Sequence, residues 1–252
     1  MTFWKALKET YGGSIAFLIA CPLLALVPFV FEMVQHVIEV HIGLYASAAA
    51  AQALQYNPLR MSFGLLKTAA LLSAGYWITR FVATRNPKYA AAIDPVALRL
   101  FAGYFLLGLA LTALQLFVIP QTVAITLVEF VAGEVITSFI VAWGAAAALG
   151  NPDVGPIASV KLMGRQLPWT VAFLLVAMLP LMVPHYVFAG VAIVGPRALL
   201  WPVLILDSLL VSWLTAVLVA SAYVAAKRAA DRSRVELGRD LQVDFPAATA
   251  AE

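Results

Sequence analysis

The sequence predicts an all-α, polytopic membrane protein: a bundle of six transmembrane helices with both termini in the cytoplasm. Composition is the first observation. Of the 252 residues, 63% are hydrophobic and only 12% are charged, with a mean hydropathy of +0.93, far from the average of soluble domains. The second is the length of the apolar runs, which are long enough to cross a hydrocarbon layer of about 30 Å. The third is the placement of basic residues, which predicts the orientation.

Six spans are predicted, at residues 13–40, 61–82, 97–119, 121–149, 168–190 and 198–226. The first contains Pro22 and Pro28, which are expected to kink the helix without ending it. The third and fourth are separated only by Ile119-Pro120-Gln121, which is typical of an antiparallel helical hairpin. Between the first two spans, the Ala-rich segment 43–56 predicts a short helix on the outer membrane surface.

Basic residues mark one side of the predicted membrane. The loops and termini on that side contain Lys5, Lys8, Arg80, Arg85, Lys88, Arg99, Lys161, Arg165, Lys227, Arg228, Arg232, Arg234 and Arg239. The other side has only Arg60 and Arg197. Because cytoplasmic loops carry the excess of Lys and Arg, both termini are predicted to be cytoplasmic. We expect a multi-pass protein of the cell inner (plasma) membrane.

The chain divides into a predicted membrane domain, residues 1–226, and a basic cytoplasmic tail, residues 227–252. The first part of the tail has helical propensity and is expected to continue the last helix, where its basic residues can contact anionic membrane lipids. Residues 243–252 are expected to be disordered.

Several classes of function are disfavoured. The net charge of +3 is spread over helix ends, so nucleic-acid binding is not expected. Cys21 is the only cysteine, which excludes intrachain disulfides and cysteine-rich metal sites. Gly-x-Ser-x-Gly, paired intramembrane aspartates and His-Glu-x-x-His are all absent, so we predict no enzymatic activity and no cofactor.

Ionisable residues inside the predicted spans are the main functional signal, because charge in hydrocarbon costs roughly 2.5–3.5 kcal/mol per residue even on the lenient insertion scale. Glu32, Lys67, Glu129 and Asp207 come from four different spans. Each is about seven to nine residues from the outer end of its span, or roughly 10–13 Å deep at 1.5 Å per residue. They therefore predict a polar layer in the outer half of the membrane.

Further side chains belong to this layer or lie near it. Glu32, His36 and Glu39 have the spacing i, i+4, i+7 and are expected to share one helix face. Glu134 is predicted to lie nearer the midplane. His185 and Arg197 are candidates for a lid above the layer.

Three interpretations of the layer compete. The first is a structural network in which Lys67 pairs with one or two acids; Glu129 and Asp207 are the candidates to be tested. The second is a proton or solute pathway open to the outside. The third is a metal site of Glu32, His36, Glu39 and Glu129, although bundle metal sites use Glu-x-x-His and not the Glu-x-x-x-His found here.

We interpret the layer as a site that binds or conducts a proton, an ion or a small solute, without a metal. Its predicted residues are Glu32, His36, Glu39, Lys67, Glu129 and Asp207. The alternative is a structural or accessory membrane protein whose buried charges only pack helices.

A small-residue stripe in the last span offers a helix contact. Ser208, Ser212, Ala216 and Ala220 recur every four residues, a pattern that lets helices approach closely. Packing within the chain is the favoured interpretation, and an interface with a second copy or a partner membrane subunit is the alternative.

The central region resembles a known family. Val118-Ile119-Pro120, the segment Gly155-Pro156-Ile157-Ala158-Ser159-Val160-Lys161-Leu162-Met163 and Trp169 resemble the YciC-like six-helix inner-membrane proteins. They are also similar to the membrane domain joined to some glycerophosphodiester phosphodiesterases. The resemblance covers about residues 115–175 and implies a six-helix architecture more than any activity.

Overall fold

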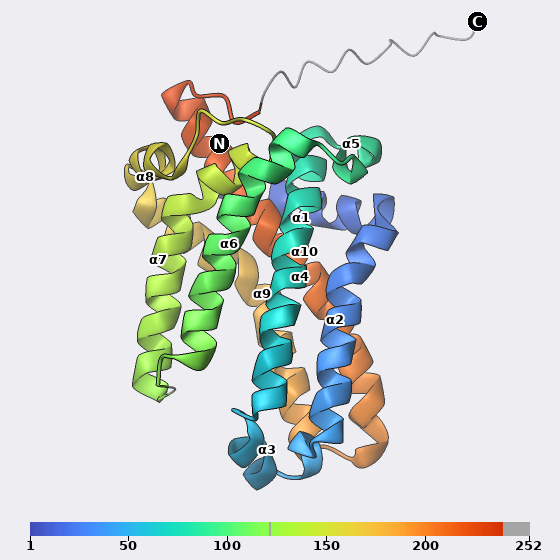
Figure 1. The fold of residues 1–252 in the computed structure, drawn as a ribbon. Coiled ribbons are helices and arrows are strands. Elements are labelled where there is room, and N and C mark those ends of the chain that lie inside the picture. The colour runs from blue at the N-terminus through green and yellow to red at the C-terminus, as the bar shows by residue number, and fades with distance from the viewer. Residues whose placement is uncertain (121, 239–252) are drawn as a thin grey trace, which may run out of the picture.

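The protein is a helical bundle. The computed structural model describes residues 1–120 and 122–238, and in this part of the chain every regular element is a helix. The α-helices are α1 (Phe3–Ala20), α2 (Pro22–His41), α3 (Ala48–Leu54), α4 (Pro58–Thr84), α5 (Pro87–Ala91), α6 (Pro95–Phe117), α7 (Val123–Ala148), α8 (Pro156–Gly164), α9 (Leu167–Val194) and α10 (Leu200–Ser233). Two 3-10 helices are η1 (Leu44–Ala46) and η2 (Arg197–Leu199). The α5 and α8 helices lie at one end of the bundle and α3 lies at the other (Figure 1); we call these the α5/α8 end and the α3 end.

Within the described residues, five helices are long and apolar enough to cross a membrane. They are Pro22–His41, Pro95–Phe117, Ala124–Ala148, Leu167–Val194 and Arg197–Ser233. The α6–α7 hairpin is the most exposed of these: Leu106 and Val128 have 60% and 68% of their surface uncovered. Such extended apolar surface suits contact with lipid. The predicted span 61–82 lies inside α4, which contains three basic residues and is not one of the five.

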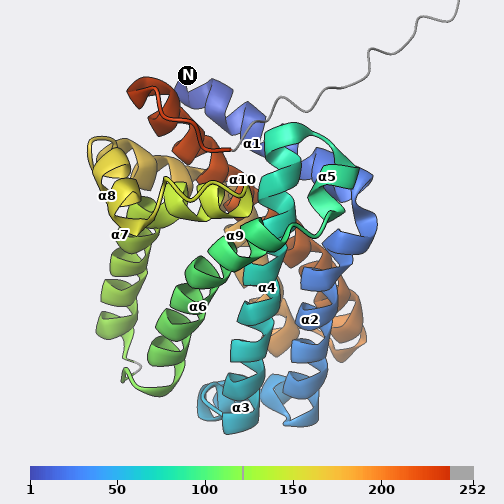
Figure 2. The same cartoon turned by 45° about the horizontal axis from the view of Figure 1, so that its top comes forward.

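The predicted first span, 13–40, is two helices instead of one kinked helix. The α1 helix ends at Ala20 and α2 begins at Pro22, with Cys21 between them in a non-helical conformation (φ −128°, ψ 53°). A residue before proline is driven out of the helical region by a clash with the proline ring, which explains the break at Cys21. Pro28, in contrast, stays inside α2. As a result α1 lies across the α5/α8 end of the bundle (Figure 2).

The α10 helix is the centre of the bundle and contacts α1, α2, α4, α7 and α9. Its predicted small-residue stripe is buried inside the chain, with Ser208, Ala216 and Ala220 all 0% exposed. The Ser212 hydroxyl, on the same stripe, donates a 2.6 Å hydrogen bond to the Ala25 carbonyl of α2. Packing within the chain is therefore confirmed as the role of this stripe.

The predicted hairpin, short helix and tail can be compared with the structure. The α6 and α7 helices pack side by side as an antiparallel hairpin, and α3 falls within segment 43–56, as expected. The α10 helix continues past residue 226 to Ser233. The predicted disorder of residues 243–252 lies outside the described residues, and the domain boundary at residue 226 stays a prediction.

The serine of the segment 155–163 joins two helices. The Ser159 hydroxyl donates to the Phe139 carbonyl (2.7 Å) and accepts from the Trp143 amide (3.1 Å). These two backbone groups of α7 are four residues apart, the spacing of an α-helical hydrogen bond. Ser159 thus bonds α8 to the backbone of α7.

A buried arginine connects the helices at the α5/α8 end. Arg80 of α4 is 1% exposed, and its guanidinium lies over the Tyr89 ring, 3.9 Å from the centroid. It donates to the carbonyls of Tyr89 and Ala148, both at 3.1 Å, and so joins α4 to α5 and to the end of α7. Asp94, before α6, lies 4.0 Å from the same side chain.

Replacement of this arginine should destabilise the bundle. A lysine ammonium cannot stack on Tyr89 and reach both carbonyls at once, and a buried carbonyl without a donor costs about 1–3 kcal/mol. We expect Arg80→Lys to lower the melting temperature in detergent, measured by circular dichroism. Arg99→Lys, a matched change at an exposed position of α6, should melt like the parent. Equal melting of all three proteins would contradict a structural role for Arg80.

Candidate functional site

The site begins with one face of α2. Glu32, His36 and Glu39 are buried, with 3%, 5% and 4% of their surface exposed, so the spacing correctly predicts a shared face. Gln35 belongs to the same buried surface and donates a 3.1 Å hydrogen bond to Glu39 Oε1. His41, at the end of α2, is exposed.

Two cations on α4 neutralise two of these acids. Lys67 Nζ lies 3.0 Å from Glu32 Oε2, an ion pair without hydrogen-bond geometry. Arg60 Nε donates to Glu39 Oε1 at 2.7 Å. Glu32 and Glu39 are seven residues apart on α2, and Arg60 and Lys67 are seven residues apart on α4. Because the two helices are antiparallel, each acid faces one cation. Glu129 and Asp207 were the expected partners of Lys67. The structure instead pairs Lys67 with Glu32.

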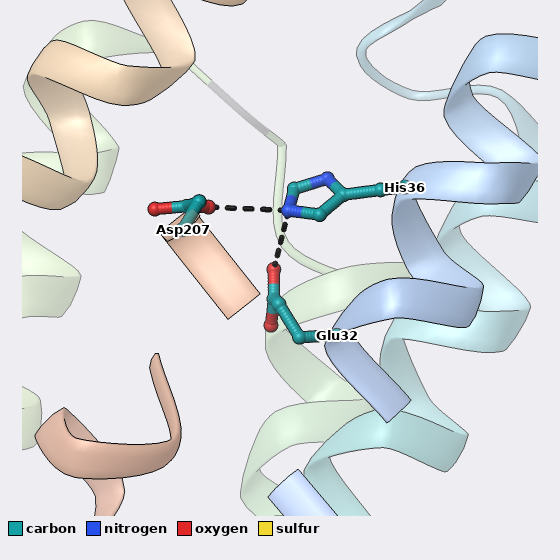
Figure 3. Close-up of side chains that lie close together, drawn as sticks. All are labelled: Glu32, His36 and Asp207. Carbon is teal, nitrogen blue, oxygen red and sulfur yellow. Dashed lines mark hydrogen bonds and ion pairs between the residues drawn. The ribbon is translucent and has the colours of Figure 1, made fainter. Parts of the chain in front are cut away.

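The third acid comes from α10. Asp207 is 2% exposed and lies between two histidines: Oδ2 is 3.1 Å from His36 Nε2, and Oδ1 is 2.8 Å from His185 Nδ1 of α9. His36 Nε2 also lies 3.7 Å from Glu32 Oε1. In Figure 3 the carboxylates of Glu32 and Asp207 both point at this nitrogen, the first from α2 and the second from α10.

A 3-10 helix covers the cluster at the α3 end. The Tyr45 hydroxyl, from η1, donates a short hydrogen bond to Glu39 Oε2 and lies 3.0 Å from His36 Nδ1. Burial raises the pKa of the Tyr45 phenol, and the neighbouring Glu39 carboxylate raises it further, so the hydroxyl keeps its proton. Arg197 donates to the carbonyls of Tyr45 (2.6 Å) and Ala46 (2.8 Å) and thereby holds η1 in place. Arg197, predicted as part of a lid, acts only through its bonds to this covering segment, whereas His185 contacts Asp207 directly.

We define the polar cluster as Glu32, His36, Glu39, Tyr45, Arg60, Lys67, His185 and Asp207. All eight line one cavity of about 470 Å³, which also contacts Gln52, Gln55, Ala189 and Ile193. The side chains of Lys67, His185 and Arg60 are 24%, 25% and 32% exposed, whereas the three acids are at most 5% exposed. The acids are therefore more deeply buried in the cavity wall than the basic groups.

Glu129 is not brought into this cluster. It belongs to α7 and is not among the residues that line the cavity. In the described part of the chain, neither of its shielded carboxylate oxygens has a hydrogen-bond partner. Glu134 is on the same helix, five residues further on, and is only half-buried. Similar depth in the membrane did not pair Glu129 with Lys67: α7 contacts α4, but the Lys67 ammonium pairs with Glu32 of α2 instead.

Three cluster residues were not predicted as site residues. Arg60 had a usable signal, because it precedes Lys67 by seven residues, as Glu32 precedes Glu39. His185 was expected only in a lid, and Tyr45 had no signal, since an isolated tyrosine in a loop is common.

The electrostatics of the cluster favour an additional positive charge. Three carboxylates face two fixed cations, Lys67 and Arg60, which leaves one net negative charge while both histidines are neutral. His36 is the group in the middle, within 3.7 Å of all three acids. A proton or a cation bound at His36 would bring the net charge of the cluster to zero or above.

The fold and the site define the class of this chain: a multi-pass helical membrane protein with charged residues buried between its helices. Comparisons with family models, with curated proteins and with solved structures gave no match. The resemblance at residues 115–175 therefore stays a prediction. In the structure, Ser159 of that segment has a packing role between α7 and α8.

The Lys67–Glu32 pair makes a direct test of the cluster. Lys67→Met leaves a buried carboxylate unpaired, which costs about 3–5 kcal/mol in buried ion pairs. We expect a large loss of melting temperature in detergent, and substantial recovery when Glu32→Gln is added. Lys67→Met with Glu129→Gln is the matched control and should remain destabilised. Recovery by Glu129→Gln instead of Glu32→Gln would refute the pairing.

Proposed function

We propose that the chain is a six-helix protein of the inner membrane with both termini in the cytoplasm, in which α4 is the sixth span. Two observations support this. The α4 helix has 27 residues and packs between α2, α6 and α10, so it runs the length of the bundle. Its central charge, Lys67, is neutralised by Glu32, which removes the main objection to placing it in hydrocarbon.

The orientation is supported by the end at which the basic loops gather. In the described part of the chain most basic residues are in α1, α5 and α8, at the end of α4, at the start of α6 and at the end of α10, which lie together in Figure 1, whereas the α3 end has only Arg60 and Arg197. By the positive-inside rule the α5/α8 end faces the cytoplasm, and the cavity then opens to the outside.

Reporter fusions test this topology. Fusions after residues 55, 90, 155, 195 and 252 should report outside, inside, inside, outside and inside, measured with paired phosphatase and fluorescent-protein reporters. A C-terminus on the outer side would overturn the orientation and the outward-facing cavity with it.

We further propose that the protein binds a small cation or a small positively charged solute from the outer side. The observation that carries this is the convergence of three buried acids and two histidines, from α2, α9 and α10, on one cavity of about 470 Å³. Intramembrane acids and histidines mark ion and proton sites more often than neutral packing positions. The proposal is for binding; no residue of the cluster is assigned a catalytic role.

Passage across the membrane needs a second conformation. From Val211 to Tyr223, α10 buries only apolar and hydroxyl-bearing side chains. Phe17, Ile78 and Phe81 fill the neighbouring core. Binding at the outer side is therefore the step that this conformation supports, and transport is its extension if the core opens.

A structural scaffold is the second candidate, and one observation favours it. Each of the three acids already has a basic partner: Lys67 for Glu32, Arg60 for Glu39 and the histidines for Asp207. Such pairing is sufficient to hold α2, α4, α9 and α10 together without any bound solute.

Solvent access separates the two candidates. In a Cys21→Ser background, a cysteine at Ala189, which lines the cavity, should react in whole cells with a membrane-impermeant thiol reagent. A cysteine at Val187, two residues away on α9 and 53% exposed on the apolar surface, should be protected because lipid excludes the reagent. Labelling is measured by a mass shift on gels. Protection at both positions would favour the scaffold.

A further inference from the structure

We propose that the cavity binds a divalent transition-metal ion, with His36 Nε2, Glu32 Oε1 and Asp207 Oδ2 as its three protein ligands. The inference rests on the proposed function, because it names the cation that the cavity takes. It differs from the metal site considered from the sequence: Asp207 is a ligand, Glu39 is not, and Glu129 is elsewhere.

The first argument is convergence of donor atoms. Ligand atoms of Glu32, His36 and Asp207 all lie within 4.8 Å of one another, and all three residues are buried. His36 Nε2 is 3.1 Å from Asp207 Oδ2 and 3.7 Å from Glu32 Oε1. Two ligands bound to one zinc at about 2.0–2.1 Å lie roughly 3.3 Å apart in a tetrahedron. The two distances at Nε2 are therefore close to those around a metal, whereas the two carboxylate oxygens, within 4.8 Å of each other, must approach by up to about 1.5 Å.

The second argument is the tautomer of His36. Its Nδ1 faces Glu39 Oε2 at 3.1 Å and the Tyr45 oxygen at 3.0 Å. Tyr45 already donates its own proton to Glu39, so both neighbours of Nδ1 are acceptors and Nδ1 carries the hydrogen. In neutral His36, Nε2 then presents a lone pair to two carboxylate oxygens. Three acceptors facing one another require either a second proton on the ring or a cation between them.

The third argument is the support around the histidine. Metal-binding histidines commonly donate their other ring N–H to a carboxylate, which orients the ring and raises its basicity. Glu39 is such a carboxylate, and it is itself held by Arg60, Gln35 and Tyr45. Asp207 is oriented in the same way by His185. These contacts place the ligands before any ion arrives.

The donor set selects the kind of metal. One imidazole nitrogen with two carboxylate oxygens suits Zn²⁺, Mn²⁺ or Fe²⁺, whereas Ca²⁺ and Mg²⁺ prefer oxygen ligands only. Three protein ligands leave coordination positions for water, and the cavity beside Glu32 and Asp207 has room for it. The net negative charge of the cluster favours binding of a cation.

The experiment uses the full-length protein in detergent, carrying an affinity tag without histidine and stripped with a chelator. Titration with Co²⁺, followed by its visible absorption and by competition with Zn²⁺, should give one ion per chain. His36→Gln, Glu32→Gln and Asp207→Asn should each abolish detectable binding. Glu39→Gln should weaken binding by about 10- to 100-fold, since it acts through His36.

Two matched variants are controls. His41→Gln makes the same substitution on the same helix at an exposed residue, and Glu129→Gln removes an acid of α7 outside the cavity. Both should bind Co²⁺ like the parent. Equal loss in a control and in its matched ligand variant would overturn the site.

One readout needs no variant, in case a ligand substitution prevents folding. Co²⁺-loaded protein should show a single hyperfine-shifted, exchangeable imidazole N–H resonance, from His36 Nδ1, because only one histidine is a ligand. Two such resonances, or a folded parent that binds no Co²⁺ and no Zn²⁺, would overturn the inference. Labelling at position 189 without metal binding would leave solute binding standing and refute the metal. Metal binding with position 189 protected would support the metal site and refute access to it from the outer side.

Discussion

Burial of charge inside apolar helices is the constraint on which this bundle depends. Glu32, Glu39 and Asp207 are nearly inaccessible, and a lone carboxylate there would be far too costly to keep ionised. Each is therefore tied to a basic residue or histidine on another helix: Lys67 and Arg60 on α4, and His185 on α9. The α2, α4, α9 and α10 helices are thus held in one relative position at the α3 end.

The α5/α8 end uses polar groups differently. Arg80 stacks on Tyr89 and bonds backbone carbonyls, and Ser159 bonds the backbone of α7. These contacts fix how short helices cover the ends of long ones, and their hydrogen-bond partners are backbone groups. The α3 end instead keeps a cavity lined by three acids, two fixed cations and two histidines. This asymmetry is why we propose binding at the α3 end and not at the α5/α8 end.

Scaffold and binding site are not exclusive roles for the polar cluster. Buried ion pairs add little net stability compared with well-packed apolar side chains, so their presence alone is weak evidence for a structural purpose. What exceeds structural need is the position of His36 between three acids, with its Nδ1 proton committed to Glu39. A purely structural network needs no group that is complete only after gaining a proton or a cation.

The sequence by itself determined the helical membrane class, the shared face of Glu32, His36 and Glu39, and the similar depth of Lys67 and Asp207. These depend on run length, on the helical repeat and on distance along a helix, which are local quantities. The tertiary structure alone decided which helices face each other, so it excluded Glu129, paired Lys67 with Glu32 and added Tyr45 and His185. Depth in the membrane gives only the position of a residue along the bundle axis. Contact between two side chains also depends on how each helix is rotated and which helices are its neighbours, and packing decides both. The break at Cys21 was similarly undecided, because a proline can stay inside a helix, as Pro28 does, or begin a new one, as Pro22 does.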